Sequence, residues 1–478
     1  MAYNLAPFAS SGLTQGTLES LLAEHRASSL PRYERLWNYY RNPHNTSHSS
    51  RLTLAAGTVS GLPAQAQGLP DRLLHPQRII DNTQAPKREI VIENDIAWRV
   101  QTMVDFAFGK AITLRSTASD AQLRATIELM LQRVWQLAGG LGFLQDFATL
   151  GHIFGHADLV LRCSESELIA SGAIVQEARE RSDQASAQRE MIRALKLLRI
   201  ELVDPRRGAA LLNEHDYREI DAYVIRSTSK GKLPSLFTRV ARSLGAGTKE
   251  ESQERIEIIS RDAWQTYENG TLRTDKRGLL VSRIPVVHVQ NQSVPFGYEG
   301  LGEVEPLIAL QDELNTRLSD RANRVTLQSF KMYLAKGIEG LDKMHVSPGL
   351  VWYTDNPNAS VQSFGGDSAT PGEDRHIQEI REALDKASSA PPIAGGVVQG
   401  KVGNLTSANA LRITLVGLLA KTDRKRLNYG RGIAAMSSLV LEALDAAGIL
   451  TTRPEDRGVE IDFADPLPSD GASQGSLR

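Results

Sequence analysis

Residues 395–402 form the pattern in this sequence that comes closest to a known chemical motif. They read Gly-Gly-Val-Val-Gln-Gly-Lys-Val, which matches the G-x-x-x-x-G-K part of a nucleotide-binding P-loop. That loop requires Ser or Thr next, because its hydroxyl binds magnesium, and this chain has Val402. The loop also follows a strand, and residues 387–392 are a poor strand sequence. We therefore interpret the segment as a glycine-rich loop and expect no cofactor.

A second glycine-rich stretch, residues 297–302, reads Gly-Tyr-Glu-Gly-Leu-Gly and resembles a dinucleotide-binding loop in part. Its third glycine is misplaced for the G-x-G-x-x-G pattern. We interpret it as a tight turn that needs a permissive backbone.

His152 and His156 are spaced like a zinc-ligand pair on a helix. Gly151 and Gly155 argue against a helix there, and no glutamate follows the first histidine. Histidines of the core or of a turn are the preferred interpretation, and no metal site is expected. No Ser/His/Asp, Cys/His or paired-carboxylate arrangement stands out, so the sequence predicts a protein that is not an enzyme.

A basic run, completed by Arg431, lies in a predicted long helix and comprises Lys421, Arg424, Lys425 and Arg426. It could face DNA or an acidic protein surface, although a solvated helix face is the default for such a run. The whole chain has no basic excess: 55 Lys and Arg stand against 56 Asp and Glu in 478 residues, a net charge of −1. A broad basic nucleic-acid-binding face is therefore not expected.

The single cysteine, Cys163, rules out an intrachain disulfide, disfavours a cysteine metal site and suits a reducing cytoplasm. No run of about 18 apolar residues predicts a transmembrane helix. Residues 1–15 do not resemble a signal peptide. The length suggests two to four structural units.

Residues 90–295 mix helical and strand patterns and predict an α+β unit with an antiparallel sheet. Helices are predicted at 93–109, 121–138, 142–151 and 174–198, and strands at 111–115, 156–162, 200–203, 217–226, 254–260, 263–267 and 284–289. Before this unit, residues 17–41 predict a helix that Pro31 breaks in two, and residues 42–75 have the composition of a linker.

From Gly302 onward the pattern favours long helices. The predicted order is a helix at 303–330, a small β-rich insert at 331–372, a helix at 373–389, a Pro- and Gly-rich break at 391–396 and a long helix at 406–447. Gly417, Gly430 and Gly432 favour a bend in the last helix.

Three passages in this order resemble the tailed-bacteriophage portal family, in the branch that lacks a large C-terminal crown. They are residues 295–308 (PFGYEGLGEVEPLI) leading into 310–320 (LQDELNTRLSD), residues 407–431 (SANALRITLVGLLAKTDRKRLNYGR) and residues 94–114 (NDIAWRVQTMVDFAFGKAITL). The similarity spans about residues 90–447.

The resemblance implies the portal fold and its division into parts. Residues 1–75 would be an N-terminal helix and flexible arm, 76–301 the wing, 302–330 a stem helix, 331–372 the clip, 373–390 the second stem helix, 391–405 the tunnel loop, 406–448 a long kinked helix returning to the wing, and 449–478 a short tail or minimal crown. The tunnel-loop residues facing the DNA channel would include Gly395, Gly396, Val397, Val398, Gln399 and Lys401.

The resemblance also implies a ring, dodecameric in the capsid, that conducts double-stranded DNA during packaging and ejection. Its partners would be the terminase large subunit, the head–tail adaptor, and the major capsid and scaffolding proteins, with no membrane. The ring would be assembled in the host cytoplasm and would lie at the capsid vertex of a phage or gene-transfer particle. Lys421, Arg424, Lys425 and Arg426 would contact DNA or a neighbouring subunit. The alternatives are another head or adaptor protein of the virion, a helical scaffold without contact to DNA, or a soluble enzyme binding phosphate at 395–402.

Overall fold

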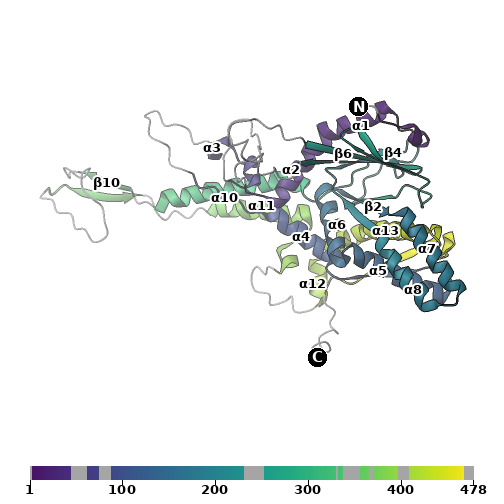
Figure 1. Ribbon diagram of the computed structural model, residues 1–478. Coiled ribbons are helices and arrows are strands. Elements are labelled where there is room, and N and C mark those ends of the chain that lie inside the picture. Colours follow the sequence, from purple (N-terminus) through teal and green to yellow (C-terminus); the bar gives the residue numbers. More distant parts are fainter. Residues whose placement is uncertain are drawn as a thin grey trace, which may run out of the picture. The chain divides into compact units, whose positions relative to one another are not determined.

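The computed structural model describes residues 3–44, 62–74, 88–230, 252–329, 332–336, 356–364, 371–396 and 408–467. The chain divides into two compact units, each built from separate stretches of chain (Figure 1). Unit 1 comprises Met1–Arg41, Ile96–Pro306 and Ser388–Arg478, and unit 2 comprises Asn42–Asp95 and Leu307–Ala387. The predicted α+β class is confirmed. Among the described helices, none is long and apolar enough to cross a membrane.

The described part of unit 1 contains three antiparallel sheets. The first has the strand order β3 (Leu198–Val203), β2 (His156–Cys163) and β9 (Val286–Gln290). The second is a meander of β4 (Gly208–Leu212), β5 (Ile220–Lys230), β6 (Ser252–Ser260), β7 (Ala263–Glu268) and β8 (Thr271–Arg277). The third pairs β1 (Ile112–Ser116) with β12 (Val459–Phe463), which joins distant parts of the sequence.

The N-terminal segment packs on the five-stranded sheet, where Figure 1 shows α1 beside β4 and β6. The 3₁₀ helix η1 (Ala6–Ser11) and α1 (Gln15–Glu24) bring Phe8 and Leu18 into one buried cluster with Val224 and Ile258 of the sheet. Each such side chain contributes about 1.5–3 kcal/mol when it is fully buried. This apolar contact fixes the start of the chain on the sheet.

Three helices pack on the three-stranded sheet: α5 (Ala121–Ala138), α6 (Gly140–Phe154) and α13 (Val416–Ala446). Helix α4 (Asp95–Phe108) packs against α13, where Phe108 contacts Tyr429. Helix α6 continues directly into β2 through Gly155, whose φ is +89°. A Cβ atom there would lie 2.1 Å from the carbonyl oxygen of Gly300, so only glycine fits. A Cβ at Gly432 would lie 2.2 Å from Val289, so this glycine allows α13 to approach β9 closely.

Two of the predicted helices in unit 1 differ from the structure. The single helix predicted at 174–198 is wrong: α7 (Glu165–Glu180) and α8 (Gln184–Ala194) form a hairpin. Ser182 adopts a positive φ of 58°, and Asp183 caps α8 by accepting the amide of Ser186 at 3.0 Å. Helix-forming Arg and Glu residues on both sides concealed this turn.

The predicted break at Pro31 is also wrong. The chain stays helical from α1 through a π-helical turn, η2 (His25–Ser29), into α2 (Leu30–Arg41). Proline is tolerated in the first turn of a helix, and the wider turn lies directly before it. Sequence reasoning also missed β4, β8 and β12, and β8 is exposed along nearly its whole length, which removes the alternation that marks a strand.

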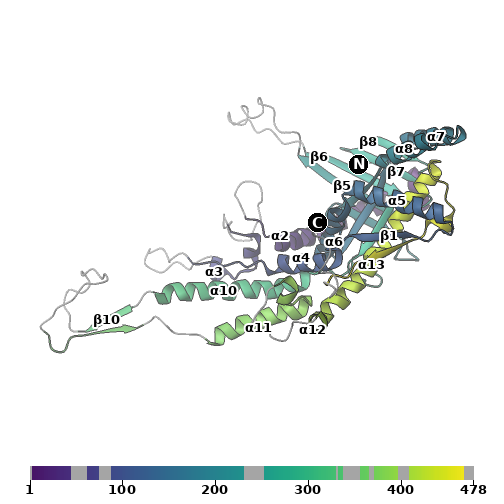
Figure 2. The same cartoon turned by 90° about the horizontal axis from the view of Figure 1, so that it is seen from below.

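Unit 2 contains two helices that lie side by side in both views (Figures 1 and 2), α10 (Ile308–Ser329) and α11 (Pro371–Ser388). Ion pairs join them, between Arg324 and Glu373 and between Arg321 and Asp374 at 3.0 Å. Helix α10 begins later than predicted because Pro306 lies in a preceding 3₁₀ turn, η5 (Glu305–Leu307). Between the helices, β10 (Met332–Lys336) pairs antiparallel with β11 (Ser360–Phe364) inside the predicted β insert.

Candidate functional site

The chain that leaves α11 is anchored before it reaches the glycine-rich loop. The buried guanidinium of Arg99 donates to the hydroxyl of Ser388 at 2.9 Å and to the carbonyl of Ala390 at 2.8 Å. The amide of Ala390 also donates to the Ser388 hydroxyl at 3.1 Å. These bonds fix Ser388 and Ala390, both of unit 1, to Arg99 of the same unit.

The turn that follows, η7 (Pro392–Gly395), packs against an indole ring. A Cβ atom at Gly395 would lie 2.5 Å from the ring of Trp98, and Gly396 adopts a φ of +78°. Gly395 is therefore required by its contact with Trp98, and Gly396 by its positive φ. The other residues predicted for the channel, Val397, Val398, Gln399 and Lys401, lie outside the described residues.

Next to this turn lies a buried charge cluster. The carboxylate of Glu303 accepts from the ammonium groups of Lys421 at 2.6 Å and Lys425 at 2.7 Å. Lys421 also donates to the carbonyl of Ser388 at 3.0 Å, and Gln292 donates to Glu303 at 2.7 Å. The cluster links α13 to Ser388 and to Glu303, all within unit 1.

The charges of this cluster do not cancel, because two ammonium groups share one carboxylate. Burial alone would raise the pKa of Glu303, but Lys425 and Lys421 outweigh it and lower this pKa to about 2. For Lys425 burial dominates and lowers the pKa to about 8, since its partner Glu303 is shared with Lys421. Burial next to these lysines lowers the pKa of His152 to about 3. Glu303 is therefore held as the anion and His152 as the neutral ring.

The four basic residues of the predicted contact run take different places. Lys421 and Lys425 are buried in the cluster just described. Arg426 donates to the carbonyls of Phe106 and Ala107 at 2.8 and 3.3 Å, at the C-terminal end of α4. Arg424 is exposed. Contact of these residues with DNA or another subunit stays a prediction, and within the described chain only Arg424 of the four is free of a burying contact.

The histidine pair is a core feature, as interpreted. His152 and His156 are 0% and 1% exposed. The expected absence of a helix was wrong for His152, which lies in α6 and faces the carbonyl of Ala148 at 2.7 Å. Gly151 allows Tyr429 to pack closely against α6, since a Cβ at this position would lie 2.0 Å from the Tyr429 hydroxyl. The described residues contain no group of His, Cys, Asp and Glu that could hold a metal ion.

The turn at 297–302 is held by a buried carboxylate that sequence reasoning missed. Asp158 on β2 accepts from the hydroxyls of Tyr223 at 2.7 Å and Tyr298 at 2.6 Å, and from Nδ1 of His288 at 2.7 Å. Burial would raise its pKa, but His288, His156 and Tyr223 lower it to about 2. A Cβ at Gly300 would lie 2.5 Å from a backbone oxygen, which confirms a tight turn. An isolated Asp in a strand pattern carries no signal that would have revealed this network.

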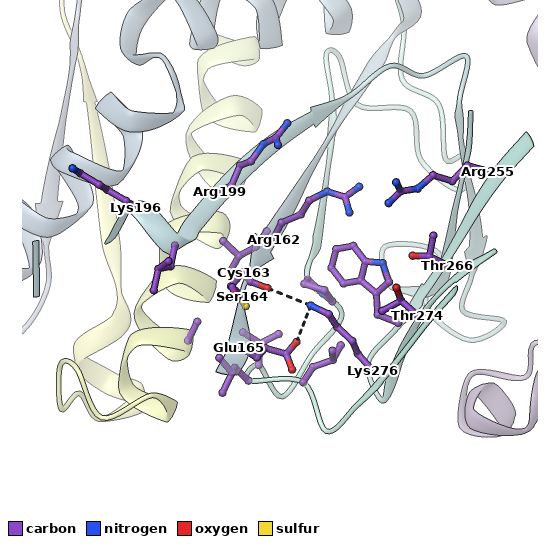
Figure 3. Close-up of a pocket in the computed structure, with 18 residues that line it drawn as sticks. Arg162, Cys163, Ser164, Glu165, Lys196, Arg199, Arg255, Thr266, Thr274 and Lys276 are labelled. Atoms are coloured by element: carbon purple, nitrogen blue, oxygen red, sulfur yellow. Dashed lines mark hydrogen bonds and ion pairs between the residues drawn. The ribbon is translucent and has the colours of Figure 1, made fainter. Parts of the chain in front are cut away.

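A pocket of about 470 Å³ between the two larger sheets is lined by five cations, an indole ring and several aliphatic side chains (Figure 3). Arg162 stacks 4.9 Å from the Trp264 ring and donates to Glu201 and Glu257 at 2.5 and 2.7 Å. Burial raises the pKa of the Cys163 thiol to about 11, so it is a poor nucleophile at neutral pH. The pocket is a salt-bridged junction of sheets and shows no catalytic arrangement.

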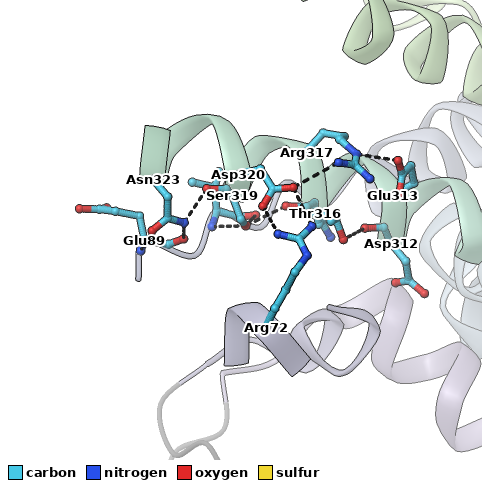
Figure 4. A network of polar contacts seen from close by, with 11 residues as sticks. Arg72, Glu89, Asp312, Glu313, Thr316, Arg317, Ser319, Asp320 and Asn323 are labelled. Atoms are coloured by element: carbon cyan, nitrogen blue, oxygen red, sulfur yellow. Dashed lines mark hydrogen bonds and ion pairs between the residues drawn. The ribbon is translucent and has the colours of Figure 1, made fainter. Parts of the chain in front are cut away.

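In unit 2, an extended strap, residues 89–93, follows a polar row on α10 (Figure 4). Alternate strap residues bond to side chains four apart on the helix: the amide of Glu89 donates to Asn323 at 2.9 Å, that of Val91 to Ser319 at 3.0 Å, and that of Glu93 to Asn315 at 3.0 Å. The row ends at Gln311, which donates to the carbonyl of Glu93 at 2.6 Å.

A second piece of unit 2 is fixed to the same helix. Arg72 forms a two-pronged ion pair with Asp320 of α10, at 2.5 and 2.8 Å, and Arg317 reaches the same carboxylate at 3.3 Å (Figure 4). A Cβ at Gly68 would lie 1.9 Å from the carboxylate of Asp312, so this segment approaches α10 closely. The polar faces of α10 are thus largely occupied by the chain's own N-terminal segments.

Two long helices around a β pair, a glycine turn and a further long helix follow one another in the order that the sequence led us to expect. The sequence matches the family described as phage portal protein, SPP1 Gp6-like, over residues 216–474, more than half of the chain. The chain belongs to this family.

Two solved structures are among those similar to this chain, both of gene transfer agent particles. One, described as the virion of the native particle, shows 12% identity, covers 77% of this chain and 79% of its own, and has a TM-score of 0.39. The other, the neck of the empty particle computed with C6 symmetry, shows 11% identity, coverage of 77% and 80%, and a TM-score of 0.39. Similarity of this degree adds nothing to the family assignment. A comparison with curated proteins finds no match.

Proposed function

We propose that this chain is the subunit of a portal ring at the capsid vertex of a tailed phage or a gene-transfer particle, where it conducts double-stranded DNA during packaging and ejection. The observation that carries the proposal is the family match over residues 216–474. That stretch includes α10, the β10–β11 pair, α11, the turn at Gly395 and α13 in the order expected for a portal.

The parts predicted from the resemblance take these roles in the proposal. The wing is 76–301, the stem helices are 302–330 and 373–390, the clip is 331–372, the tunnel loop is 391–405, the long helix is 406–448, and the flanking segments are 1–75 and 449–478. The β10–β11 pair lies in the proposed clip, which would dock the terminase large subunit and later the head–tail adaptor. The wing would meet the major capsid and scaffolding proteins.

The proposed tunnel loop starts from a fixed base and carries little charge. Arg99 holds Ala390, the residue just before the loop, and Trp98 packs against Gly395. Residues 395–405 contain one cation, Lys401. Many phosphate contacts would hold DNA and oppose its movement, so a nearly uncharged loop suits passage. The energy for packaging would come from a separate ATPase docked on the clip.

Electron microscopy of the purified protein in negative stain tests the proposal. We expect dodecameric rings with a central hole. Protein that remains monomeric at every concentration tested, and on addition of scaffolding protein, would contradict it. Saturable ATP binding that Lys401→Ala abolishes would instead favour the alternative of a phosphate-binding enzyme.

A further inference from the structure

The outer side of α12 (Ala408–Thr414) and of the first half of α13 is apolar and exposed. Ile413 is 74%, Val416 63% and Leu427 58% exposed, and Ala420 is also exposed. Steps of three, four and seven residues keep these side chains on one side of a helix. We call this surface, Ile413, Val416, Ala420 and Leu427, the outer stripe.

The inner side of the same segment buries two lysines beside Leu415 and Leu418, so the usual separation of polar and apolar faces is partly inverted. Lys421 and Lys425 point into unit 1 and end on Glu303, at 2.6 and 2.7 Å. A helix on a free protein surface has the opposite arrangement, with aliphatic side chains inside and lysines in water. A helix with lysines inside and aliphatic residues outside is expected where a second protein surface covers the outer side.

The charged residues beside the outer stripe describe the surface that would cover it. Arg424 and Arg431 are exposed, and neither has an ion-pair partner within the described part of the chain. Asp423 is the one exposed carboxylate between the apolar positions. The covering surface is therefore expected to be apolar and to present carboxylates.

We propose that the outer stripe is the surface on which a second copy of this chain packs in the ring. The inference rests on the proposed function, since a closed ring joins two unlike faces of identical subunits head to tail. Helix α12 also begins soon after the proposed tunnel loop, where identical subunits would converge on the channel. Each subunit thus needs an apolar face that is exposed in the isolated chain and buried by the neighbouring subunit, and the outer stripe is exposed and apolar.

Other exposed aliphatic residues lack these features and supply a matched control. Leu129 on α5 is 58% exposed, the same fraction as Leu427. It lines an apolar groove with Met191 and Ile192 of α8, and nothing in the structure indicates what covers that groove. Replacement of either leucine by aspartate therefore costs the isolated subunit a similar, small amount.

The experiment compares Leu427→Asp, Val416→Asp and Leu129→Asp with the unmodified chain. Mass photometry over a concentration series measures the ring fraction, and thermal denaturation measures the fold of the subunit. We expect all variants to melt as the unmodified chain does. Leu427→Asp and Val416→Asp should raise the concentration needed for assembly by about tenfold or more, because each buries a carboxylate in place of an aliphatic group. Leu129→Asp should assemble normally.

A crosslink identifies the occupant directly. Benzoylphenylalanine at position 416, in a mixture of ¹⁴N- and ¹⁵N-labelled chains, should give a covalent dimer whose linked peptides carry both labels. A crosslink confined to one chain would overturn the inference, since the stripe would then be covered by its own molecule. Rings that Leu427→Asp leaves intact would also overturn it while the proposed function stands. An unmodified chain that never forms rings would overturn the proposed function and this inference with it.

Discussion

At the scale of residues, Glu303 is the carboxylate that balances the buried lysines of α13. One carboxylate serves Lys421 and Lys425, so the cluster holds one more positive than negative charge when every group is ionised. A buried ion pair contributes little net stability, but removal of one partner leaves a desolvated charge. Removal of one charged partner should therefore cost more stability than the intact pair contributes, and single substitutions can measure this cost.

Glu303→Gln should destabilise the protein by about 3–5 kcal/mol, because it leaves two buried ammonium groups without a carboxylate. Glu305→Gln is the matched control. Glu305 is 51% exposed and pairs with Arg32, so its loss should cost less than about 1 kcal/mol. Urea unfolding of both variants measures the difference, and equal losses would refute the role given to Glu303.

Lys425 predicts an unusual rise of stability with pH. Its pKa is about 8 in the folded protein and 10.5 ordinarily, so between these values the unfolded chain binds a proton that the folded chain does not. Unfolding then takes up a proton, and stability rises with pH over this window by roughly 3 kcal/mol in total. Lys425→Met should remove this rise. Urea midpoints measured from pH 8 to 10.5 test it, and parallel curves for the two proteins would contradict it.

Gly395→Ala should destabilise the base of the proposed tunnel loop by about 1–3 kcal/mol, because its Cβ would enter the ring of Trp98. Gly16→Ala supplies the comparison. Gly16 lies in α1, has no heavy atom within 4 Å of a Cβ, and should be neutral or slightly stabilising. Thermal unfolding followed by Trp fluorescence reads both. A neutral Gly395→Ala would show that the turn does not need its contact with Trp98.

At the scale of elements, the strap can follow the polar row because two residues of extended chain and four residues of helix advance by similar distances. Two residues of extended chain advance about 6.7 Å, and four residues of helix advance about 6 Å. Glu89, Val91 and Glu93 can therefore bond in turn to side chains spaced four apart on α10. The helix substitutes for the neighbouring strand of a sheet, and its side chains take the place of backbone groups.

Asn315→Ala should loosen the strap. Asn315 is fully buried and accepts the amide of Glu93 at 3.0 Å, so its loss should cost about 1–3 kcal/mol. Hydrogen exchange read by mass spectrometry should show faster exchange in a peptide containing residues 88–95. Thr326→Ala, at an exposed position of α10, should leave that peptide unchanged. Unchanged exchange in Asn315→Ala would mean that the bond does not hold the strap.

Sequence patterns predicted the helices whose apolar residues recur periodically. They failed where one local or long-range contact determines the structure. The periodicity of apolar residues predicted α5 at its observed bounds and most of α4 and α11. It could not locate the turn between α7 and α8, which depends on Ser182 and Asp183 alone. Nor could it show that Lys421 and Lys425 point inward, because a basic run reads as a solvated face until its partner Glu303, more than a hundred residues away, is known.

At the scale of the whole molecule, the near-zero net charge predicts weak and salt-insensitive contact with DNA. A protein that neutralises many phosphates loses affinity steeply as salt rises, by about one power of salt concentration for each contact. With a net charge of −1 and Lys421 and Lys425 buried, this chain should show a shallow slope. Fluorescence anisotropy of labelled duplex DNA against assembled protein measures it. A slope that corresponds to many phosphate contacts would contradict the view of a passive conduit.

The segments of the two units alternate along the chain, and this limits how the protein can be divided into fragments. The backbone passes between them after Arg41, Asp95, Pro306 and Ala387. No single cleavage of the backbone therefore releases either unit as an intact fragment. Neither unit can be removed as one continuous segment of chain. The pairing of β1 with β12 also joins residues 112–116 to residues 459–463 within unit 1. A nascent chain thus cannot complete this sheet of unit 1 until β12 has left the ribosome, about 340 residues after β1.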